Sequence, residues 1–210
     1  MKQWIRNKDG DMMKFDLVHD IQSAYRKVVD SISRPGLIST LQEETAMIEF
    51  HTGCFPSTKV LALMLLDIEV TFKVVSKREE EITGMLNQLT YAKAAEANEA
   101  DFIFILKDCD RNQLETAIRS AKTGSLMNPH ESAILIIETE SVSTGIDLVM
   151  TGSGIETEQE ASIDGADTWL DLRAEKNKEY PLGIDTILTD TSHSILCLPR
   201  TTQIKKRVTI

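Results

Sequence analysis

The sequence predicts an α/β protein built on a mixed β-sheet with helices on its faces. Segments with helical spacing alternate along the chain with short apolar segments of strand length. One of these, 102–106, is continuously apolar, as strands covered on both faces are. Two strands close together near the end, 186–189 and 194–198, predict a hairpin. The sheet is therefore expected to be mixed rather than purely parallel.

Five segments are predicted to be helical. Residues 16–33 place apolar side chains every third or fourth position, and Arg34-Pro35-Gly36 ends this helix. The segment 57–66 is apolar nearly all round, which predicts a buried helix with Ser57 as its N-cap. Residues 79–89 are typical of a surface helix. Asp110 and Gln113 predict a capping box for a helix that ends at Gly124, and a last helix covers 166–176.

The remaining strands are predicted from short apolar or alternating segments at 69–75, 133–137 and 146–150. An irregular or weakly extended stretch contains Met47, Ile48 and Phe50. The chain ends in a basic, extended tail at 203–210, so the sheet is expected to have a free edge near its C-terminal strands.

Composition limits the classes of function. The 210 residues are 41% hydrophobic, enough for the core of one domain. The formal charge of −10 argues against non-specific binding to nucleic acid and against docking to an anionic membrane. Three cysteines without metal spacing indicate reduced thiols, and the N-terminus lacks an apolar signal segment, so a soluble cytoplasmic protein is expected.

Motifs that carry chemistry are absent from the sequence: it has no GxGxxG, GxxxxGK[ST], HExxH or GxSxG. The four histidines share no metal-ligand spacing, so no metal is expected. Thr151-Gly152-Ser153-Gly154 has two interpretations. It is a turn or, less in keeping with the absence of a following helix, a nest of backbone amides for a small anion.

The most distinctive residues lie in the last quarter of the chain. In the segment Tyr180–Asp185, Pro181 and Gly183 predict a rigid corner, and Asp185 can bind nearby backbone amides. Pro199 is expected to end a strand, so that Arg200, Thr201 and Thr202 present a guanidinium and two hydroxyls outside the sheet. Gly183 and Asp185 are expected to act through folding, and Arg200 through a partner or ligand while leaving the fold unaffected.

Three arginines, Arg26, Arg34 and Arg200, lie beside these structural signatures. Guanidinium groups suit bidentate binding of phosphate or phosphonate oxygens. The alternative is ion pairing with the acidic residues that this chain has in excess.

An ordered set of segments resembles the PhnH family, the H subunits of the bacterial carbon-phosphorus lyase system. The segments span residues 16–204; they are Tyr25–Val29, Ser33–Gly36, Leu66–Phe72, Met150–Ile155, Tyr180–Asp185 and Pro199–Thr202. The loop 128–133, which contains His130, departs from the family pattern, so a functional role for it stays open. The resemblance implies an N-terminal extension at 1–15, a single PhnH-like domain at 16–204 and a basic tail at 205–210.

The resemblance implies a three-layer fold similar to the large domain of pyridoxal-phosphate-dependent transferases, in a vestigial form without the cofactor. It also implies a homodimer that joins the G, I and J subunits in a core complex for phosphonate catabolism when phosphate is scarce. That complex is an α-D-ribose 1-methylphosphonate 5-triphosphate synthase, which uses ATP and an alkylphosphonate. The H subunit supports this transferase step, and its own contact with phosphonate or ATP stays open.

Two alternatives remain beside a subunit that is not catalytic alone. The arginines allow an independent phosphonate- or phosphate-binding protein. An active pyridoxal-phosphate transferase would need a Schiff-base lysine, for which Lys107 and Lys122 are candidates in settings that do not resemble such a site. We therefore expect no cofactor.

Overall fold

The computed structural model describes residues 3–6, 12–15, 17–46 and 53–207. Its centre is a seven-stranded sheet in which β5, β4, β6, β7 and β10 run parallel, and β11 is antiparallel to both of its neighbours. The prediction of a mixed sheet is confirmed. In spatial order the strands are β3 (Ile38–Thr40), β11 (Ser194–Leu198), β10 (Asp185–Thr189), β7 (Ile134–Glu138), β6 (Phe102–Ile105), β4 (Thr71–Val75) and β5 (Lys93–Ala94).

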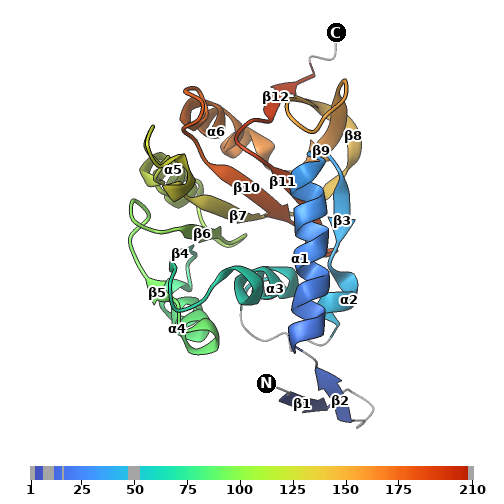
Figure 1. The fold of residues 1–210 in the computed structure, drawn as a ribbon, viewed down its shortest axis with the longest axis vertical. Coiled ribbons are helices and arrows are strands. Elements are labelled where there is room, and N and C mark those ends of the chain that lie inside the picture. The colour runs from blue at the N-terminus through green and yellow to red at the C-terminus, as the bar shows by residue number, and fades with distance from the viewer. Residues whose placement is uncertain (1–2, 7–11, 16, 47–52, 208–210) are drawn as a thin grey trace.

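Helices cover both faces of this sheet (Figure 1). On one face lie α1 (Leu17–Ser33), α3 (Pro56–Leu65) and α4 (Glu79–Thr90); on the other lie α5 (Arg111–Ser120) and α6 (Leu170–Lys176). Side chains alternate between the two cores along each strand: in β11, Ile195 and Cys197 face α1, whereas Leu196 and Leu198 face the opposite layer. The three layers follow from this alternation.

The second face is completed by a three-stranded antiparallel sheet in the order β12-β8-β9. Its strands are β8 (Val142–Thr151), β9 (Gln159–Ile163) and β12 (Gln203–Lys206). The sequence predicted only part of β8 and missed β9, in which only Ala161 and Ile163 are apolar, too few to show an alternating pattern. The extended tail is confirmed as β12, which pairs with β8.

The expected free edge near the C-terminal strands is not at β11, which is covered by β3; the C-terminal strand β12 instead forms one edge of the second sheet. The missed strand β3 is only three residues long and half-buried, so its pattern was too short to identify from periodicity.

The predicted helices are present, with corrections at their ends. The capping box of α5 is confirmed, since Asp110 accepts from the Gln113 N–H and Gln113 accepts from the Asp110 N–H. That helix ends at Ser120 rather than Gly124, because Thr123 turns into an antiparallel bridge with Ser132. Ser57 as N-cap of α3 is wrong: Phe55 occupies that position, and the buried Ser57 hydroxyl accepts from Thr189 at 2.7 Å.

The shorter elements complete the chain: β1 (Gln3–Arg6), β2 (Met12–Phe15), α2 (Gln42–Thr45), and the 3-10 turns η1 (Pro129–Glu131) and η2 (Ala166–Thr168). The predicted helix 166–176 is thus divided into η2 and α6. Met47, Ile48, Phe50 and the last three tail residues lie outside the described residues. In the described part of the chain, no helix has the length and apolar character needed to cross a membrane.

Candidate functional site at the C-terminal corner

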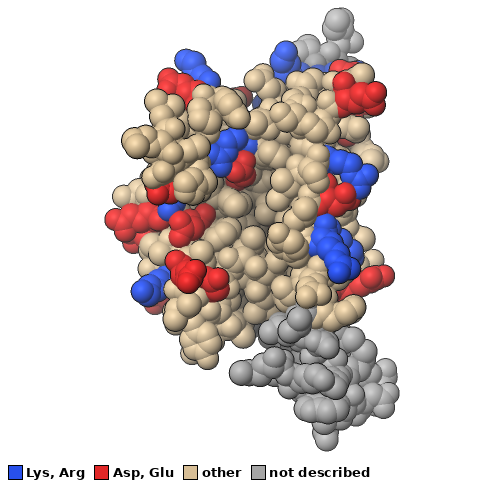
Figure 2. Space-filling model, viewed as in Figure 1, with Lys and Arg blue, Asp and Glu red and all other residues tan. Residues whose placement is uncertain are grey.

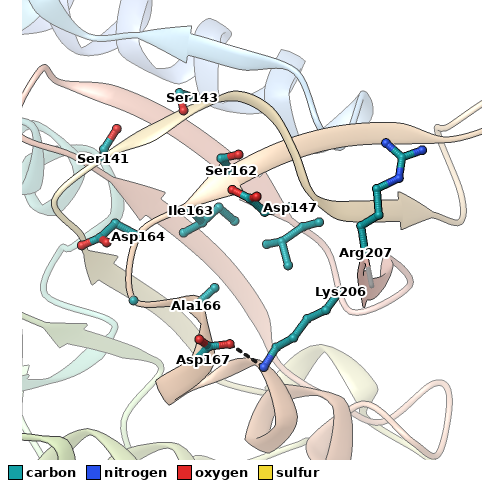
Figure 3. A pocket seen from close by; sticks show the side chains of 12 residues that line it. Ser141, Ser143, Asp147, Ser162, Ile163, Asp164, Ala166, Asp167, Lys206 and Arg207 are labelled. Atoms are coloured by element: carbon teal, nitrogen blue, oxygen red, sulfur yellow. Dashed lines mark ion pairs between the residues drawn. The ribbon is translucent and has the colours of Figure 1, made fainter. Parts of the chain in front are cut away.

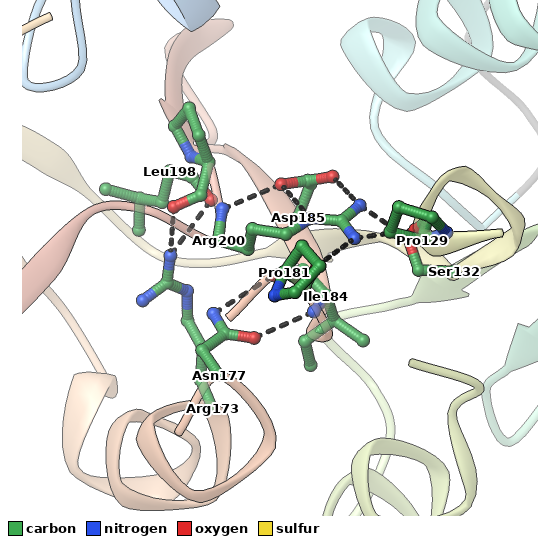
Figure 4. A network of polar contacts seen from close by, with 10 residues as sticks. Pro129, Ser132, Arg173, Asn177, Pro181, Ile184, Asp185, Leu198 and Arg200 are labelled. Carbon is green, nitrogen blue, oxygen red and sulfur yellow. Dashed lines mark hydrogen bonds and ion pairs between the residues drawn. The ribbon is translucent and has the colours of Figure 1, made fainter. Parts of the chain in front are cut away.

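The residues singled out near the C-terminus converge on one polar cluster, which we call the C-terminal corner: residues 129–132, 173–185 and 198–202 (Figure 4). As predicted, β11 ends at Leu198, directly before Pro199. Arg200 then turns inward. Its Nη2 donates to Asp185 Oδ2 at 2.5 Å and also to Ser132 Oγ, while its backbone N–H donates to Asp185 Oδ1 at 2.7 Å. The carboxylate partner of Arg200 is therefore Asp185 of the same chain.

The same guanidinium joins two loops. Arg200 Nη1 donates to the carbonyl oxygens of Pro129 at 2.8 Å and Pro181 at 3.3 Å. The Arg200 side chain is only 16% exposed. Because its removal would leave an aspartate, a serine and two carbonyls without these hydrogen bonds, we now expect the loss of Arg200 to affect the fold as well.

A second arginine, Arg173 on α6, completes the corner and was missed by the sequence reasoning. It is 3% exposed, and its guanidinium donates to the carbonyl oxygens of Leu198, Pro199 and Thr202 at 2.7 to 3.1 Å. Burial lowers the pKa of Arg173 to about 10, which leaves it charged at neutral pH. Arg173 thus fixes the backbone from which Arg200 projects.

The turn at Gly183 is fastened from α6 rather than by Asp185. Gly183 has φ 143°, so the expectation of a conformation unfavourable to side chains is confirmed. A β-carbon there would lie 2.5 Å from Asn177 Oδ1. Asn177 both accepts from the Ile184 N–H, at 2.7 Å, and donates to the Ile184 carbonyl, at 3.1 Å. An asparagine in the last turn of a helix carried no signal in the sequence that distinguished it from a surface residue.

The segment Thr151–Gly154 is a turn, closed by the Ile155 N–H on the Gly152 carbonyl at 3.1 Å. Its glycines lie against two other segments that resemble the family, Ser33–Gly36 and Pro199–Thr202. A β-carbon at Gly152 would lie 2.5 Å from the Thr201 carbonyl oxygen, and one at Gly154 would lie 2.5 Å from that of Ser33. The turn interpretation is confirmed, and its glycines permit close backbone packing.

The remaining predicted site residues are Arg26, Arg34, Thr201 and Thr202. Arg26 and Arg34 are exposed on or just after α1, and Arg34 pairs with Asp30 on the same helix. Thr202 is 2% exposed, and in the described residues its hydroxyl has no partner, while Thr201 is half-buried. The structure therefore brings Gly183, Asp185, Arg200, Thr201 and Thr202 together but places Arg26 and Arg34 on another surface.

At the carboxyl ends of parallel strands, where α/β proteins commonly bind ligands, the end of β7 contacts other segments of the chain. Glu138, at the end of β7, is buried beside the start of α3. Its Oε1 accepts from the Phe55 N–H and the Thr58 hydroxyl, each at 2.6 Å, and its Oε2 accepts from the Lys107 N–H at 3.1 Å. Burial raises the pKa of Glu138, against the effect of these hydrogen bonds. The Glu138 side chain thus joins the end of β7 to the residues that begin α3.

A cavity of about 500 Å³ lies between the β8–β9 hairpin, η2 and the end of β12 (Figure 3). Its lining includes Asp147, Asp164 and Asp167 as well as Lys206 and Arg207. Lys206 forms an ion pair with Asp167, and Arg207 with Glu160 at 2.5 Å. Because both cations are already paired and acidic groups predominate, this cavity is poorly suited to a phosphate or phosphonate.

The candidate Schiff-base lysines are both engaged in ion pairs. Lys107 pairs with Glu140, and Lys122 with Asp101 at 2.6 Å. Burial raises the pKa of the Cys197 thiol to about 12, so this thiol stays protonated at neutral pH. Among the described residues, no group of three or more His, Cys, Asp or Glu is placed to hold a metal ion.

Comparison with known proteins identifies relatives over nearly the whole chain. A sequence model of the family described as "Bacterial phosphonate metabolism protein (PhnH)" matches residues 14–205. HtxG of Stutzerimonas stutzeri, whose name assigns it to a C-P lyase, is 30% identical over 186 residues, which cover 87% of this chain and 85% of HtxG. The alpha-D-ribose 1-methylphosphonate 5-triphosphate synthase subunit PhnH of Rhizobium meliloti (strain 1021) is 26% identical over 192 residues, 91% of this chain and 93% of that subunit.

Proposed function

Because the chain belongs to the PhnH family, we propose that it is the H subunit of a carbon-phosphorus lyase core complex and serves phosphonate catabolism. The observation that carries this proposal is the family match over residues 14–205, together with relatives aligned over most of both chains. In this role the chain supports formation of ribose 1-methylphosphonate 5-triphosphate from ATP and an alkylphosphonate.

The geometry favours an accessory role over an independent active site. Arg200 pairs with Asp185, and both Arg173 and Arg200 donate to backbone carbonyls of the chain itself. At the carboxyl end of β7, Glu138 is engaged by Phe55 and Thr58 of the chain itself. Of the three arginines that an independent phosphonate-binding protein would need to bring together, Arg200 is engaged in the corner, whereas Arg26 and Arg34 are exposed on or just after α1. A subunit that contributes surface and stability to a larger catalyst fits these features best.

The finer assignments extend this proposal. The chain assembles with G, I and J subunits in the cytoplasm and forms a homodimer when isolated. Its three-layer architecture derives from the pyridoxal-phosphate transferase fold without retaining the cofactor, since both candidate lysines are held by carboxylates. Incubation with pyridoxal phosphate is expected to give no internal-aldimine absorbance, and a stoichiometric band that borohydride fixes to one lysine would contradict the vestigial interpretation.

Co-expression tests the assembly. The chain is produced with tagged G, I and J subunits from the same organism, and the captured material is analysed by size-exclusion chromatography with light scattering. We expect this chain to co-elute in a stable stoichiometry, and a strain lacking it to stop growing on methylphosphonate as sole phosphorus source while growing normally on phosphate. Normal growth of that strain on methylphosphonate, with no co-elution, would rule out the proposed function.

A further inference from the structure

The outer face of α1 carries a stripe of exposed apolar side chains. Tyr25 is 59% exposed, Val29 is 43% exposed and Ile32 is 44% exposed. Residues three and four positions apart are neighbours on the same side of an α-helix, so these side chains form one continuous surface about 10 Å long. Ala24 and Val28, on the inner side of the helix, are buried in the core. We call Tyr25, Val29 and Ile32 the α1 stripe.

Two charged side chains of α1 lie on one flank of the α1 stripe. Arg26 and Asp30 are four positions apart and therefore lie on the same side of the helix, next to Val29. Asp30 pairs with Arg34, but its side chain is 44% exposed and its carboxylate can accept further hydrogen bonds. Among the described residues, Arg26 forms no ion pair. An unpaired guanidinium and an accessible carboxylate thus border the same apolar surface.

The charges around the α1 stripe are balanced, although the chain as a whole has a formal charge of −10. Three basic residues face three acidic residues of α1, α2 and the end of α1: Arg26, Lys27 and Arg34 with Asp30, Glu43 and Glu44. Figure 2 views the molecule from the side on which α1 lies, and it shows few charged groups over the middle of this face. Two copies that meet here avoid the repulsion that more acidic surfaces would cause.

A second copy of the chain complements this surface when the two α1 helices pack antiparallel about a two-fold axis. With the axis between positions 28 and 29, Tyr25 lies level with Ile32 of the second copy, and Val29 packs beside its own counterpart. Each flank of one helix then faces the same flank of the other, so Arg26 comes within one residue of the level of Asp30 of the second copy. A parallel pair would face opposite flanks and keep Arg26 apart from Asp30.

We infer that the α1 stripe is the surface through which two copies of this chain form a homodimer, with their α1 helices antiparallel and Arg26 of each copy paired with Asp30 of the other. The three apolar side chains of each copy supply the centre of the contact, and the two ion pairs supply its polar rim. This inference rests on the proposed function and deepens it, because it assigns the surface that the proposed homodimer uses.

The first test measures the dimer dissociation constant of the purified full chain in a dilution series, by light scattering and analytical ultracentrifugation. Val29→Glu should raise this constant at least about tenfold, because it places two carboxylates beside the axis against apolar side chains. The matched control is Leu89→Glu, which introduces the same charge at a 48% exposed position of α4 and should change the constant less than about twofold. Circular dichroism checks that both variants are folded.

Two further variants test the register of the helix pair. Arg26→Glu should raise the dissociation constant about threefold or more, because a second carboxylate then faces Asp30 of the other copy. Val29→Cys should form a disulfide-linked dimer on mild oxidation, since the axis brings the two positions 29 together. Leu89→Cys and the unaltered chain, with its three native cysteines, should not form this link under the same conditions.

The possible failures are distinct from a failure of the proposed function. Unchanged dimer affinity in Val29→Glu, or the absence of a cross-link in Val29→Cys, would overturn the assignment of the α1 stripe, as would a strictly monomeric unaltered chain at high micromolar concentration. A Val29→Glu variant that stays dimeric but no longer co-elutes with the G, I and J subunits would assign the stripe to one of those subunits and also overturn the inference. Co-elution of the unaltered chain and growth on methylphosphonate decide the subunit role independently of these results.

Discussion

The α1 layer and the C-terminal corner hold their segments in place by different physical means. On its buried side, α1 packs Ala24 and Val28 against the sheet, and on its outer side Tyr25, Val29 and Ile32 stay partly exposed. In the view of Figure 2 the middle of this face carries few charges, and acidic and basic groups gather towards its margins. Contacts of this kind depend on area and tolerate small changes of shape.

The corner depends instead on a few directional contacts. Arg173 and Arg200 bind carbonyl oxygens and a carboxylate, Asn177 holds the turn, and Gly183 allows that turn to approach. Each group has a fixed partner, so one substitution leaves several polar atoms unsatisfied. The contrast teaches that residues resembling a phosphate-binding signature can be architectural, and it predicts a steep dependence on single residues in the corner only.

Arg173→Met should have the largest effect. Methionine keeps much of the length of the side chain but leaves the carbonyl oxygens of Leu198, Pro199 and Thr202 without their donor. The cost of burying the guanidinium is regained, so we expect a net loss of about 3 kcal/mol in the free energy of unfolding, measured in urea. Arg34→Met is the control, because its exposed pair with Asp30 should contribute less than about 0.5 kcal/mol. Equal losses would erase the distinction between the two regions.

Arg200→Ala should lower stability by about 2 kcal/mol, because a charged donor to Asp185 and to two carbonyls is removed from a mostly buried position. Arg200→Lys should recover less than half of this loss, since an ammonium group cannot reproduce the fork. Urea unfolding of both variants, with Asp185→Asn to complete a double-mutant cycle, measures the coupling. A coupling energy near zero between Arg200 and Asp185 would show that their ion pair does not stabilise the fold, and would leave the guanidinium available to a ligand.

Two glycine substitutions should change stability in opposite directions. Gly183→Val is expected to lower it by about 1 to 3 kcal/mol, because the φ of 143° is unfavourable for a side chain and Asn177 would be displaced. Gly84→Ala, at an exposed position of α4 with nothing within 4 Å of the new carbon, should raise it by about 0.5 to 1 kcal/mol. Thermal and urea unfolding report both, and a neutral Gly183→Val would show that the turn is not under constraint.

The smallest effect is a pH dependence within the α1 layer. Glu44 is buried, which raises its pKa, but hydrogen bonds from Lys27 and Ser23 outweigh burial and leave the pKa below its ordinary value of 4.5. A carboxyl with a lowered pKa stabilises the fold above that value, and this contribution is lost as the pH falls through the folded-state pKa. Glu44→Gln should therefore cost about 1 kcal/mol at pH 7 and progressively less below pH 4.5. A difference that stays constant down to pH 3 would contradict the assignment to the ionised form.

The sequence by itself determined the elements whose signal is local. The periodicity of α1, the capping box of α5 and the apolar strands β6, β7, β10 and β11 were predicted correctly, because each depends on neighbours within a few residues. The ordered segments from Tyr25 to Thr202 likewise identified the family over most of the chain. The conformations of Gly183 and of the turn at Thr151–Gly154 were also local properties.

Only the tertiary structure decided what those segments do. Arg200 reads as a free guanidinium in the sequence, and its partners lie 15 to 71 positions away. Arg173, Glu138 and Asn177 gave no signal, since a buried charge and a surface charge have the same letter in a sequence. β9 and β3 were missed because β9 has few apolar residues and β3 is only three residues long. Burial and polar partnership arise when the chain closes on itself, and both depend on distances between segments that no local pattern encodes.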